Sequence, residues 1–378
     1  MMDNNFKMLA TTLFGFEPLL EKELRQLGAM NIKTGVRNVS FVGDTGFMYK
    51  ANLSLRTALA ILKPIYHFKF HSEDEFYQKL YQYDWMNIMD VDKSFMVSSN
   101  NFQSIFNNSQ FIALRTKDAV VDHFRDKVNK RPNVSKDEPQ IIINVHVNRN
   151  NCTINLDSSG DKLFKRGYRT ATNIAPINEV LAAGLLMHSG WDGQCDFIDP
   201  MCGSGTILIE AAMIACKIPP NLNRKTFGFM HWKDWDEEMF EIIMNSVLKK
   251  IRPFHFKIKG IDKAPSAVRK AQDNIDKANL SEFISIRHDD FFSTSKDSDR
   301  PLHMLFNPPY GNRLDVNPEL FYKTLGSTLK QHYQNTNVWL ITSDEDMPKF
   351  IDLKGSRRIK VFNGGIEGKL YQFKIDAE

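Results

Sequence analysis

The chain has 378 residues, of which 42% are hydrophobic and 25% are charged, and its formal net charge is +4. This composition is ordinary for a globular protein, and the length predicts roughly two or three domains. The small excess of positive charge permits binding to nucleic acid but does not require it.

Two classes of protein are excluded by the same survey. None of the four cysteines forms a pair with CxxC spacing, which predicts no zinc site and no other metal. No run reaches the roughly 18 apolar residues that span a membrane, and the N-terminus lacks the features of a signal peptide. Few cysteines in a long chain suit a reducing compartment. We therefore expect a cytoplasmic protein without membrane contact.

The first 66 residues alternate strand and helix patterns. A strand is predicted over residues 7–13, and apolar residues at helical spacing predict a helix over 16–27 that Gly28 ends. A second strand is predicted over 39–42 and a second helix over 53–62. This alternation predicts a small α+β domain of the ferredoxin type over residues 1–66.

Residues 67–159 form the next predicted unit. It contains a helix that begins over 75–80, a strand over 94–98, a long helix over 108–128, and a hairpin of strands 140–148 and 152–157. Cations on the long helix and in the loop after it, among them Arg115, Lys117 and Arg131, are candidates for binding RNA phosphates. The alternative is a solvated helix face, because aspartates alternate with these cations.

From residue 160 onward, strands alternate with helices as in a doubly wound α/β domain. Strands are predicted over residues 195–199, 257–262, 284–288, 303–307 and 337–342, followed by a terminal hairpin of residues 355–362 and 370–375. An insertion between residues 216 and 252 carries aromatic residues next to cations. These rings suit stacking on unpaired bases and suit a local hydrophobic cover equally well.

The strand over 195–199 leads into a glycine-rich turn and a helix over 207–214. Such a turn brings backbone N–H groups close to a ligand at the carboxyl edge of a sheet. Asp199 at the strand tip is a candidate acceptor for the amino group of a methionine moiety. Leu208 stands where a dinucleotide fingerprint needs Gly or Ala, so the pattern fits NAD poorly. A purely structural turn is the alternative. The turn reads Pro200-Met201-Cys202-Gly203-Ser204-Gly205-Thr206.

Two more acids follow the next two strands. Asp262 can accept both ribose hydroxyls of a nucleoside, although an acid at a strand end is also a common turn residue. Asp290 can accept from an adenine amino group while Phe291 packs on the ring. Each signal is weak alone, but three acids at three successive strand ends predict a nucleoside-containing cofactor.

The tetrad Asn307-Pro308-Pro309-Tyr310 follows the strand before it directly. An exocyclic amine of a nucleobase is a poor nucleophile, because its lone pair is delocalised into the ring. The Asn307 side-chain carbonyl and the Pro308 backbone carbonyl can accept both amine hydrogens, and two prolines hold these oxygens in place. Tyr310 can stack on a base that has been flipped out. A rigid turn without chemistry is the alternative.

These motifs carry a resemblance to a known family. Residues 307–314 resemble motif IV of the amino-methyltransferases, and the glycine turn resembles their motif I. Residues 164–169, with Asn173, Ala175-Pro176 and Asn178-Glu179, resemble the segment before motif I in bacterial ribosomal RNA guanine-N2 methyltransferases that carry an N-terminal THUMP domain. Residues 115–119, 131–132 and 157–160 resemble the THUMP region. The resemblance covers nearly the whole chain.

The resemblance implies a Rossmann-like class I methyltransferase domain over 160–378, preceded by the ferredoxin-like subdomain over 1–66 and a THUMP domain over 67–159. It implies S-adenosylmethionine as cofactor and ribosomal RNA as partner. The expected catalytic residues are Asn307, Pro308 and Tyr310. The expected RNA contacts are Arg115, Lys117, Arg131, Arg166 and Arg169. The expected cofactor contacts are Asn173, Ala175, Pro176, Asp199, Pro200, Cys202, Gly203, Ser204, Gly205, Thr206, Asp262, Asp290, Phe291 and Asn307.

Alternatives stay open at this point. The tetrad does not distinguish guanine N2 from adenine N6, so an N6-adenine methyltransferase on DNA or RNA is the second hypothesis, and the N-terminal domains favour RNA. A non-catalytic RNA-binding assembly protein is the third. Some relatives carry a second methyltransferase domain, whereas this chain ends at residue 378, so we expect one modification. The sequence leaves the target nucleotide and the oligomeric state open.

Overall fold

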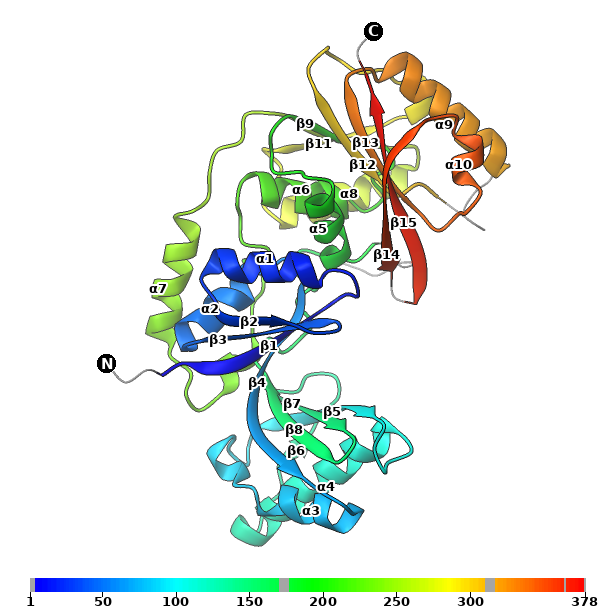
Figure 1. The fold of residues 1–378 in the computed structure, drawn as a ribbon. Helices are drawn as coiled ribbons and strands as arrows, with labels where there is room; N and C mark the ends of the chain where they lie inside the picture. Colours follow the sequence, from blue (N-terminus) through cyan, green and yellow to red (C-terminus); the bar gives the residue numbers. More distant parts are fainter. Residues whose placement is uncertain (1–3, 170–176, 310–316, 364, 377–378) are drawn as a thin grey trace.

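The structure is a computed structural model that describes residues 4–169, 177–309, 317–363 and 365–376. Within these residues the strands form one sheet of eight and one of seven. Figure 1 shows three lobes in a row: a lower lobe with α3, α4 and β5 to β8, a middle lobe with α1, α2 and β1 to β3, and an upper lobe built on the seven-stranded sheet.

The middle lobe confirms two predicted strands and one helix. Gly28 ends the first helix with φ of 96°, and its N–H donates to the Arg25 carbonyl, as the sequence predicts. Asp44 caps the second helix by accepting from the Phe47 N–H. The elements are β1 (Phe6–Thr12), α1 (Glu17–Leu27), β2 (Met30–Thr34), β3 (Asn38–Gly43) and α2 (Thr45–Ser54).

The helix predicted over 53–62 is wrong, because α2 ends at Ser54 and β4 (Ala58–Lys69) begins shortly after it. β4 lies between β1 and β8. A central strand buried on both faces lacks the alternation that identifies strands, and a run of Ala, Leu and Ile then resembles a helix. Pro64 is accommodated where the pairing of β4 with β8 shifts register.

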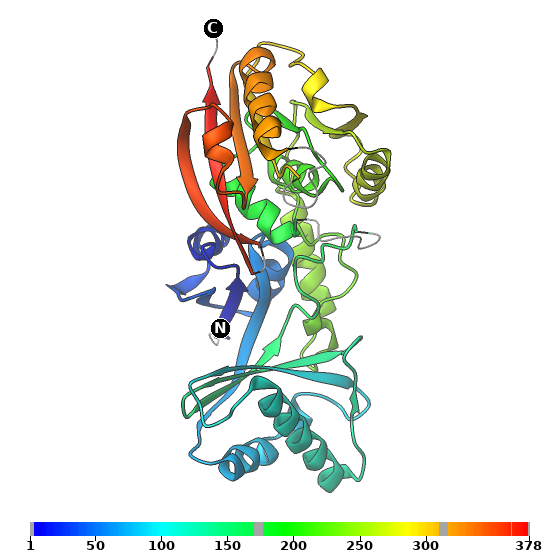
Figure 2. The ribbon, with the colours of Figure 1, turned by 90° about the vertical axis from the view of Figure 1, so that its right-hand side faces the viewer.

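The lower lobe continues the same sheet, whose strand order is β2-β3-β1-β4-β8-β7-β5-β6. The boundary predicted between residues 66 and 67 falls inside β4, so the two lobes share one sheet. Figure 2 shows α3 and α4 together below the lower part of this sheet, on the side away from the middle lobe. The elements are α3 (Glu73–Gln82), η1 (Trp85–Asn87), β5 (Ser94–Phe102), α4 (Ser109–Val128), β6 (Asn133–Val134), β7 (Ile141–Asn148) and β8 (Asn151–Asp157).

The upper lobe has the strand order β11-β10-β9-β12-β13-β15-β14, with β15 antiparallel to its neighbours. The predicted doubly wound pattern is confirmed. The order reverses at β9, which is where ligands bind in such sheets. The elements of this part of the chain, of which η2 and α7 pack on the middle lobe, are α5 (Glu179–His188), β9 (Asp196–Asp199), α6 (Thr206–Ala215), η2 (Gly228–His231), α7 (Glu237–Leu248), β10 (Ile258–Asp262), α8 (Pro265–Lys277), β11 (Ile284–His288), η3 (Phe291–Ser293), β12 (Leu302–Phe306), α9 (Pro318–His332), β13 (Thr336–Thr342), α10 (Met347–Phe350), β14 (Gly355–Asn363) and β15 (Ile366–Ile375).

The two faces of the upper sheet are covered unequally. One apolar cluster packs α5, α6 and α8 against one face, and a second packs α9 and α10 against the other. The connection from β11 to β12, residues 289–301, contains only the short η3. The α9 face of the sheet therefore receives no helix from this connection.

The aromatic insertion packs on the middle lobe. Phe227 and Phe229 are 2% and 1% exposed, and they join the core cluster that also holds Phe240 of α7. The Tyr49 ring of α2 lies 4.5 Å from the Phe229 ring. This burial supports the hydrophobic-cover alternative and leaves these rings no face for an RNA base.

A buried ion pair at α6 is linked to the middle lobe by hydrogen bonds with Arg56. Arg166 Nε lies 3.2 Å from Glu210 Oε1, and both side chains are fully buried. Arg166 also donates to the Arg56 carbonyl at 2.7 Å and to Asn221 Oδ1 at 3.2 Å. Arg56 in turn donates to the carbonyls of the α6 region, including Ile218 at 2.7 Å. The expectation that Arg166 contacts RNA is wrong, because its guanidinium has no access to solvent.

Gly326 in α9 offers a test of how tightly the upper lobe is packed. A Cβ added there would lie 1.8 Å from the Ile351 carbonyl oxygen, so Gly326→Ala has to push α10 away. We expect this variant to lower the free energy of unfolding by about 1–3 kcal/mol, despite the better helix propensity of Ala. Urea titration measures it. Ser327→Ala on the exposed side of the same helix is the matched control, and a Gly326→Ala variant as stable as that control would contradict the packing.

Candidate active site

The glycine turn has the expected shape. Gly203 has φ of +54° and Gly205 has φ of +79°, a region that glycine enters without steric cost. Gly205 is the N-cap of α6, so the turn delivers the chain directly to a helix N-terminus. A Cβ added at Gly203 would meet no atom within 4 Å, which shows open space beside the turn.

Gly260 in β10 allows the turn to lie close to the neighbouring strand. A Cβ there would lie 2.5 Å from Leu208 Cδ1 and 3.1 Å from Cys202 Sγ. Cys202 itself is 6% exposed and donates its backbone N–H to the Ile261 carbonyl at 3.0 Å. The sequence reasoning missed Gly260, although a glycine inside a strand pattern is a known sign of close backbone approach.

Asp262 connects the tip of β10 to the turn. Its Oδ2 accepts from the Gly203 N–H at 2.9 Å, and its Oδ1 accepts from the Ala264 N–H at 2.9 Å. Each carboxylate oxygen has two lone pairs, so both can still accept a hydroxyl hydrogen from a ligand. Asp262 thus fixes the turn and presents free acceptor capacity at the carboxyl edge.

Asp199, the first of the three predicted acids, is a buried carboxyl. It is 1% exposed and accepts a hydrogen bond from the Met201 N–H at 3.1 Å. Burial, with a smaller contribution from the nearby Asp262 charge, raises the pKa of Asp199 to about 8. At neutral pH this carboxyl is therefore mostly protonated, and a cation placed beside it would favour the ionised form.

Arg169 braces the turn instead of facing solvent. Its side chain is 17% exposed, and its Nε lies 2.8 Å from Glu179 Oε1. Its Nη2 donates to Thr206 Oγ1 at 3.0 Å, at the first residue of α6. The expectation that Arg169 contacts RNA is therefore corrected to a positioning role. Asn274, which donates to the Ser204 carbonyl at 2.9 Å, holds the other side of the turn.

Asp290, the third predicted acid, lies where the sequence predicts. The ring of the next residue, Phe291, does not. Asp290 is exposed at the end of β11, and its Oδ1 accepts from the Phe292 N–H at 3.0 Å. Phe291 is 3% exposed, and its ring packs 5.0 Å from the Tyr333 ring. This burial contradicts the expectation that the Phe291 ring stacks on adenine, because its faces are already used by the core.

Asn307 follows β12, the strand beside β9. It is half-buried and Pro308 is buried. A small cavity of about 10 Å³ lies beside Asn307, and its wall also contains Ile177, Thr342, Ser343, Val361, Ile366 and Gly368. The structure thus brings Asn307 to the same sheet edge as Asp199 and Asp262. Four predicted site residues, Tyr310, Asn173, Ala175 and Pro176, lie outside the described residues.

The expected RNA contacts on the lower lobe differ in availability. The Arg115 guanidinium lies 4.2 Å from the centre of the Tyr77 ring, and its Nε is 3.4 Å from Glu73 Oε1. Lys117 Nζ is 2.6 Å from Asp118 Oδ1. Arg131 is exposed and forms no ion pair with a described residue. Of the three, Arg131 is the side chain most available to a phosphate.

Comparison with family models assigns each part of the chain. The model described as "RMKL-like, methyltransferase domain" matches residues 166–372, a THUMP domain matches 70–157, and an RlmL ferredoxin-like domain matches 7–62. These matches confirm the fold class expected from the sequence. No helix in the described part of the chain is long and apolar enough to cross a membrane.

Two curated relatives are named ribosomal RNA large subunit methyltransferase K/L. The one from Marinomonas sp. (strain MWYL1) is 33% identical over 97% of this chain and 52% of its own length. The one from Colwellia psychrerythraea (strain 34H / ATCC BAA-681) is 34% identical over 100% of this chain and 54% of its own length. This chain therefore spans about half the length of these relatives.

Two solved structures resemble the whole chain. A protein assigned as a methyltransferase and crystallised with SAH has a TM-score of 0.87 and 29% identity, with 100% of both chains covered. A protein from Listeria monocytogenes str. 4b F2365, described as a predicted N6-adenine-specific DNA methylase, has a TM-score of 0.85 and 27% identity. The match covers 98% of this chain and 96% of that one.

Proposed function

We propose a function from one premise: the chain belongs to the family of RMKL-like methyltransferase domains. The proposed reaction is transfer of a methyl group from S-adenosylmethionine to the exocyclic N2 of a guanine in 23S ribosomal RNA. The observation that carries this proposal is the hydrogen bond between Asp262 Oδ2 and the Gly203 N–H. This bond joins Asp262 at the end of β10 to the glycine turn that follows β9. The strand on the other side of β9 is β12, which leads to Asn307.

The residues present fit the proposed cofactor. Asp199 is a buried carboxyl without a counter-ion in the described structure, which suits the ammonium of the methionine moiety. Asp262 has acceptor capacity for the ribose hydroxyls, and Asp290 is exposed at the edge where the adenine would lie. When bound, S-adenosylmethionine supplies an electrophilic methyl group on a sulfonium.

The chain's own contribution to transfer is orientation. The Asn307 side-chain carbonyl and the Pro308 carbonyl accept the two amine hydrogens and turn the nitrogen lone pair toward the methyl group. Pro308 is buried and its φ is fixed, so its carbonyl is held before the base enters. As the N–C bond forms, the sulfur–methyl bond would break and leave the neutral thioether S-adenosylhomocysteine, and the nitrogen would lose one proton to solvent. Stacking of Tyr310 on the base remains part of the proposal.

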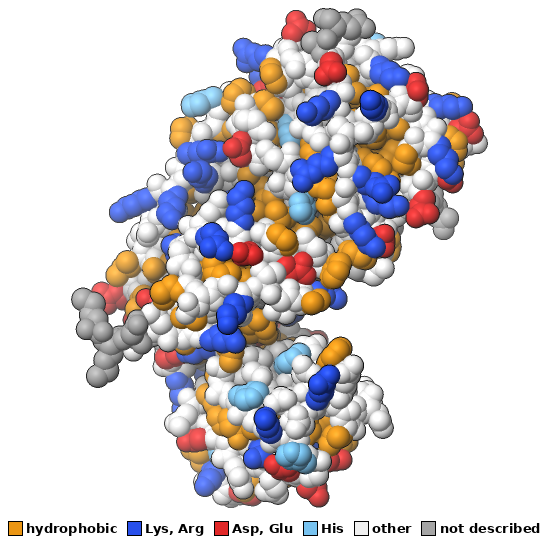
Figure 3. Space-filling model, viewed as in Figure 1, with side chains coloured by type: hydrophobic (Ala, Val, Ile, Leu, Met, Phe, Trp, Pro, Cys, Tyr) orange, Lys and Arg blue, Asp and Glu red, His pale blue; other side chains and the backbone are white. Residues whose placement is uncertain are grey.

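The proposed RNA partner rests on the lower lobe and on surface charge. The names of the two curated relatives and the match to a THUMP domain support an RNA substrate. Lys and Arg side chains also gather over the middle and upper lobes on the face shown in Figure 3. We also propose a cytoplasmic location, because ribosomal RNA is the proposed substrate.

Adenine N6 is the second candidate, because the similar protein from Listeria carries that description. Transfer of labelled methyl to ribosomal RNA from a strain lacking the gene, followed by nucleoside analysis, separates the two. N2-methylguanosine supports the proposal. N6-methyladenosine keeps the chemistry and changes the base. Absence of label from both naked RNA and ribosomal precursors would overturn the enzymatic proposal and favour an assembly protein.

Replacing the proposed amine acceptor separates chemistry from binding. We expect Asn307→Ala to lower kcat at least about 100-fold, because one of two fixed acceptors is lost, with little change in affinity for S-adenosylhomocysteine. Single-turnover methylation and calorimetry measure the two effects. Ser343→Ala, on the same small cavity, is the matched control. Loss of cofactor affinity in Asn307→Ala would show that Asn307 acts mainly as the cofactor contact that the sequence also predicts, and would contradict its role as the amine acceptor.

The raised pKa of Asp199 predicts a pH-dependent cofactor affinity. Because the pKa of Asp199 lies at about 8 in the empty site, binding of an ammonium group below that pH must expel a proton. We expect the affinity for S-adenosylhomocysteine to rise up to about tenfold per pH unit between about pH 6 and 7.5. Asp199→Asn should bind weakly and without this slope. A flat wild-type profile would show that Asp199 does not pair with the ligand.

The exposed cations after α4 test the RNA proposal. Lys130 and Arg131 are exposed and form no ion pair with a described residue. We expect Lys130→Glu/Arg131→Glu to weaken binding to ribosomal RNA about tenfold at low salt and to reduce the salt slope by about two. Filter binding at several salt concentrations measures both. Lys249→Glu/Lys250→Glu after α7 makes the same charge change on the middle lobe, and equal losses in both variants would contradict a specific contact.

A further inference from the structure

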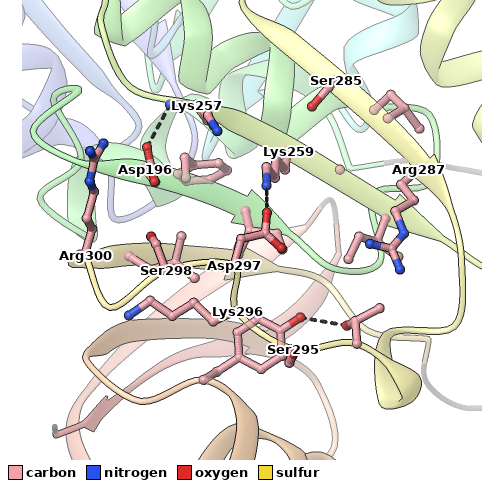
Figure 4. Close-up of a pocket in the computed structure, with 18 residues that line it drawn as sticks. Asp196, Lys257, Lys259, Ser285, Arg287, Ser295, Lys296, Asp297, Ser298 and Arg300 are labelled. Atoms are coloured by element: carbon pink, nitrogen blue, oxygen red, sulfur yellow. Dashed lines mark hydrogen bonds and ion pairs between the residues drawn. The ribbon is translucent and has the colours of Figure 1, made fainter.

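A second cavity lies on the α9 face of the upper sheet, where the connection 289–301 supplies no α-helix. Its volume is about 360 Å³, and its walls come from β9, β10, β11 and the segment 294–302 (Figure 4). Asp196 at the start of β9 lines it, whereas Asp199 ends that strand, about 10 Å further along. None of the residues expected to bind the cofactor lines this cavity.

Cations exceed acids in the cavity wall. Asp196 and Asp297 are its two carboxylates, and Figure 4 shows Arg300 toward one end and Arg287 toward the other. The five cations are Lys257, Lys259, Arg287, Lys296 and Arg300. Arg287 is already paired with Asp289, so the attraction for an anion rests on the other cations of the wall. A concave site strengthens that attraction, because low-dielectric walls concentrate the field.

The pairing of these cations leaves capacity for an anion. Lys259 forms an ion pair with Asp297 across the cavity. Lys296 Nζ donates to the Gln334 carbonyl at 2.6 Å, a partner without charge. Lys257 and Arg300 form no ion pair with a described residue. Burial lowers the pKa of both Lys259 and Lys296, so a bound anion would stabilise their charged forms.

The rest of the wall suits more than a bare anion. Ile198, Ile261 and Leu302 contribute apolar surface. The hydroxyl groups of Ser285, Ser295 and Ser298 add further donors and acceptors. A volume of about 360 Å³ is in the range of small-molecule sites and exceeds what inorganic phosphate needs. The chemistry therefore combines charge for a phosphate, hydroxyls for a sugar and apolar surface for a base.

We propose that this cavity binds a nucleoside phosphate, with the phosphate toward the end of the cavity that Lys257 and Arg300 line and the base on the apolar wall. The site goes beyond the proposed function, because neither the cofactor nor the target amine occupies it. The ligand is either a free nucleotide or the 5′-terminal nucleotide of an RNA, and both present the same chemical group.

Calorimetry of the full chain with guanosine 5′-monophosphate tests the proposal. Saturating S-adenosylhomocysteine keeps the nucleotide out of the cofactor site. We expect binding to wild type and at least about tenfold weaker binding to Lys257→Glu/Arg300→Glu, because two attractive charges become repulsive. Guanosine without phosphate should bind at least about tenfold more weakly than the nucleotide. Arg269→Glu/Lys270→Glu on α8, on the opposite face of the sheet, is the matched control and should bind as wild type does.

A second variant keeps the test valid if Lys257→Glu/Arg300→Glu does not fold. Ser285→Trp adds a large side chain at an exposed strand position in the cavity wall and should block the nucleotide without changing charge. No detectable binding to wild type at about 1 mM nucleotide would overturn the proposal. Binding that survives both Lys257→Glu/Arg300→Glu and Ser285→Trp would overturn it as well.

Competition identifies the source of the ligand. A short single-stranded RNA with a 5′-phosphoguanosine that displaces the nucleotide from wild type, but does not bind the cavity variants, assigns the site to an RNA end. Failure of the RNA to displace it assigns the site to free nucleotides. The same variants should keep wild-type affinity for S-adenosylhomocysteine. If the wild-type protein binds no S-adenosylhomocysteine, the proposed function is refuted. The nucleotide titration can still be interpreted in that case.

Discussion

The buried pair Arg166–Glu210 is the constraint on which the arrangement of the lobes depends. Both side chains are withdrawn from water, and burial raises the pKa of Glu210 while the Arg166 and Arg56 charges oppose that shift. Removing one partner of such a pair typically costs roughly 3–5 kcal/mol, because the other charge is left buried alone. The pair therefore permits few alternative placements of α6. Since Arg166 also donates to the Arg56 carbonyl, the same guanidinium fixes α6 against the middle lobe.

A second arginine extends this control to the proposed active site. Arg169 follows Arg166 by three residues and contacts Thr206, while Arg166 contacts Glu210, four residues further along α6. Residues four apart lie on the same side of a helix. The segment 166–169 therefore contacts α6 at two positions on one side. The first residue of α6 follows Gly205, and the position of the glycine turn is thereby tied to the middle lobe. That lobe shares its sheet with the lower lobe, so the proposed RNA contacts and the glycine turn belong to one connected framework.

The sequence predicts those parts of the candidate site that are formed by contiguous residues. The glycine turn and the position of Asn307 after a strand follow from local chain geometry, and both are as expected. Prediction from sequence failed for Arg166 and Arg169, because burial of a guanidinium depends on Glu210 and Glu179, which are distant in the sequence. It failed for Phe291 for the same reason, since Tyr333 occupies its ring face. The strand β4 was misread because a strand buried on both faces carries no alternating pattern. A glycine inside a strand pattern signals close backbone approach, but the sequence does not say which residues approach Gly260, because Cys202 and Leu208 are distant in the chain.

The two binding regions proposed on the upper sheet differ in the charge of their side chains, and this difference has a physical consequence. At the carboxyl edge, the acids Asp199 and Asp262 meet across the turn, and their mutual repulsion contributes to the raised pKa of Asp199. A ligand with a sulfonium and an ammonium relieves that repulsion, whereas a phosphate would add to it. In the cavity on the α9 face, cations outnumber acids. A phosphate is therefore attracted there, and a cationic ligand is repelled. Because the effective dielectric constant of partly buried sites is low, these preferences act over the short distance between the two sites. One sheet can therefore hold a cationic cofactor and an anionic ligand at once, with each site excluding the other's ligand.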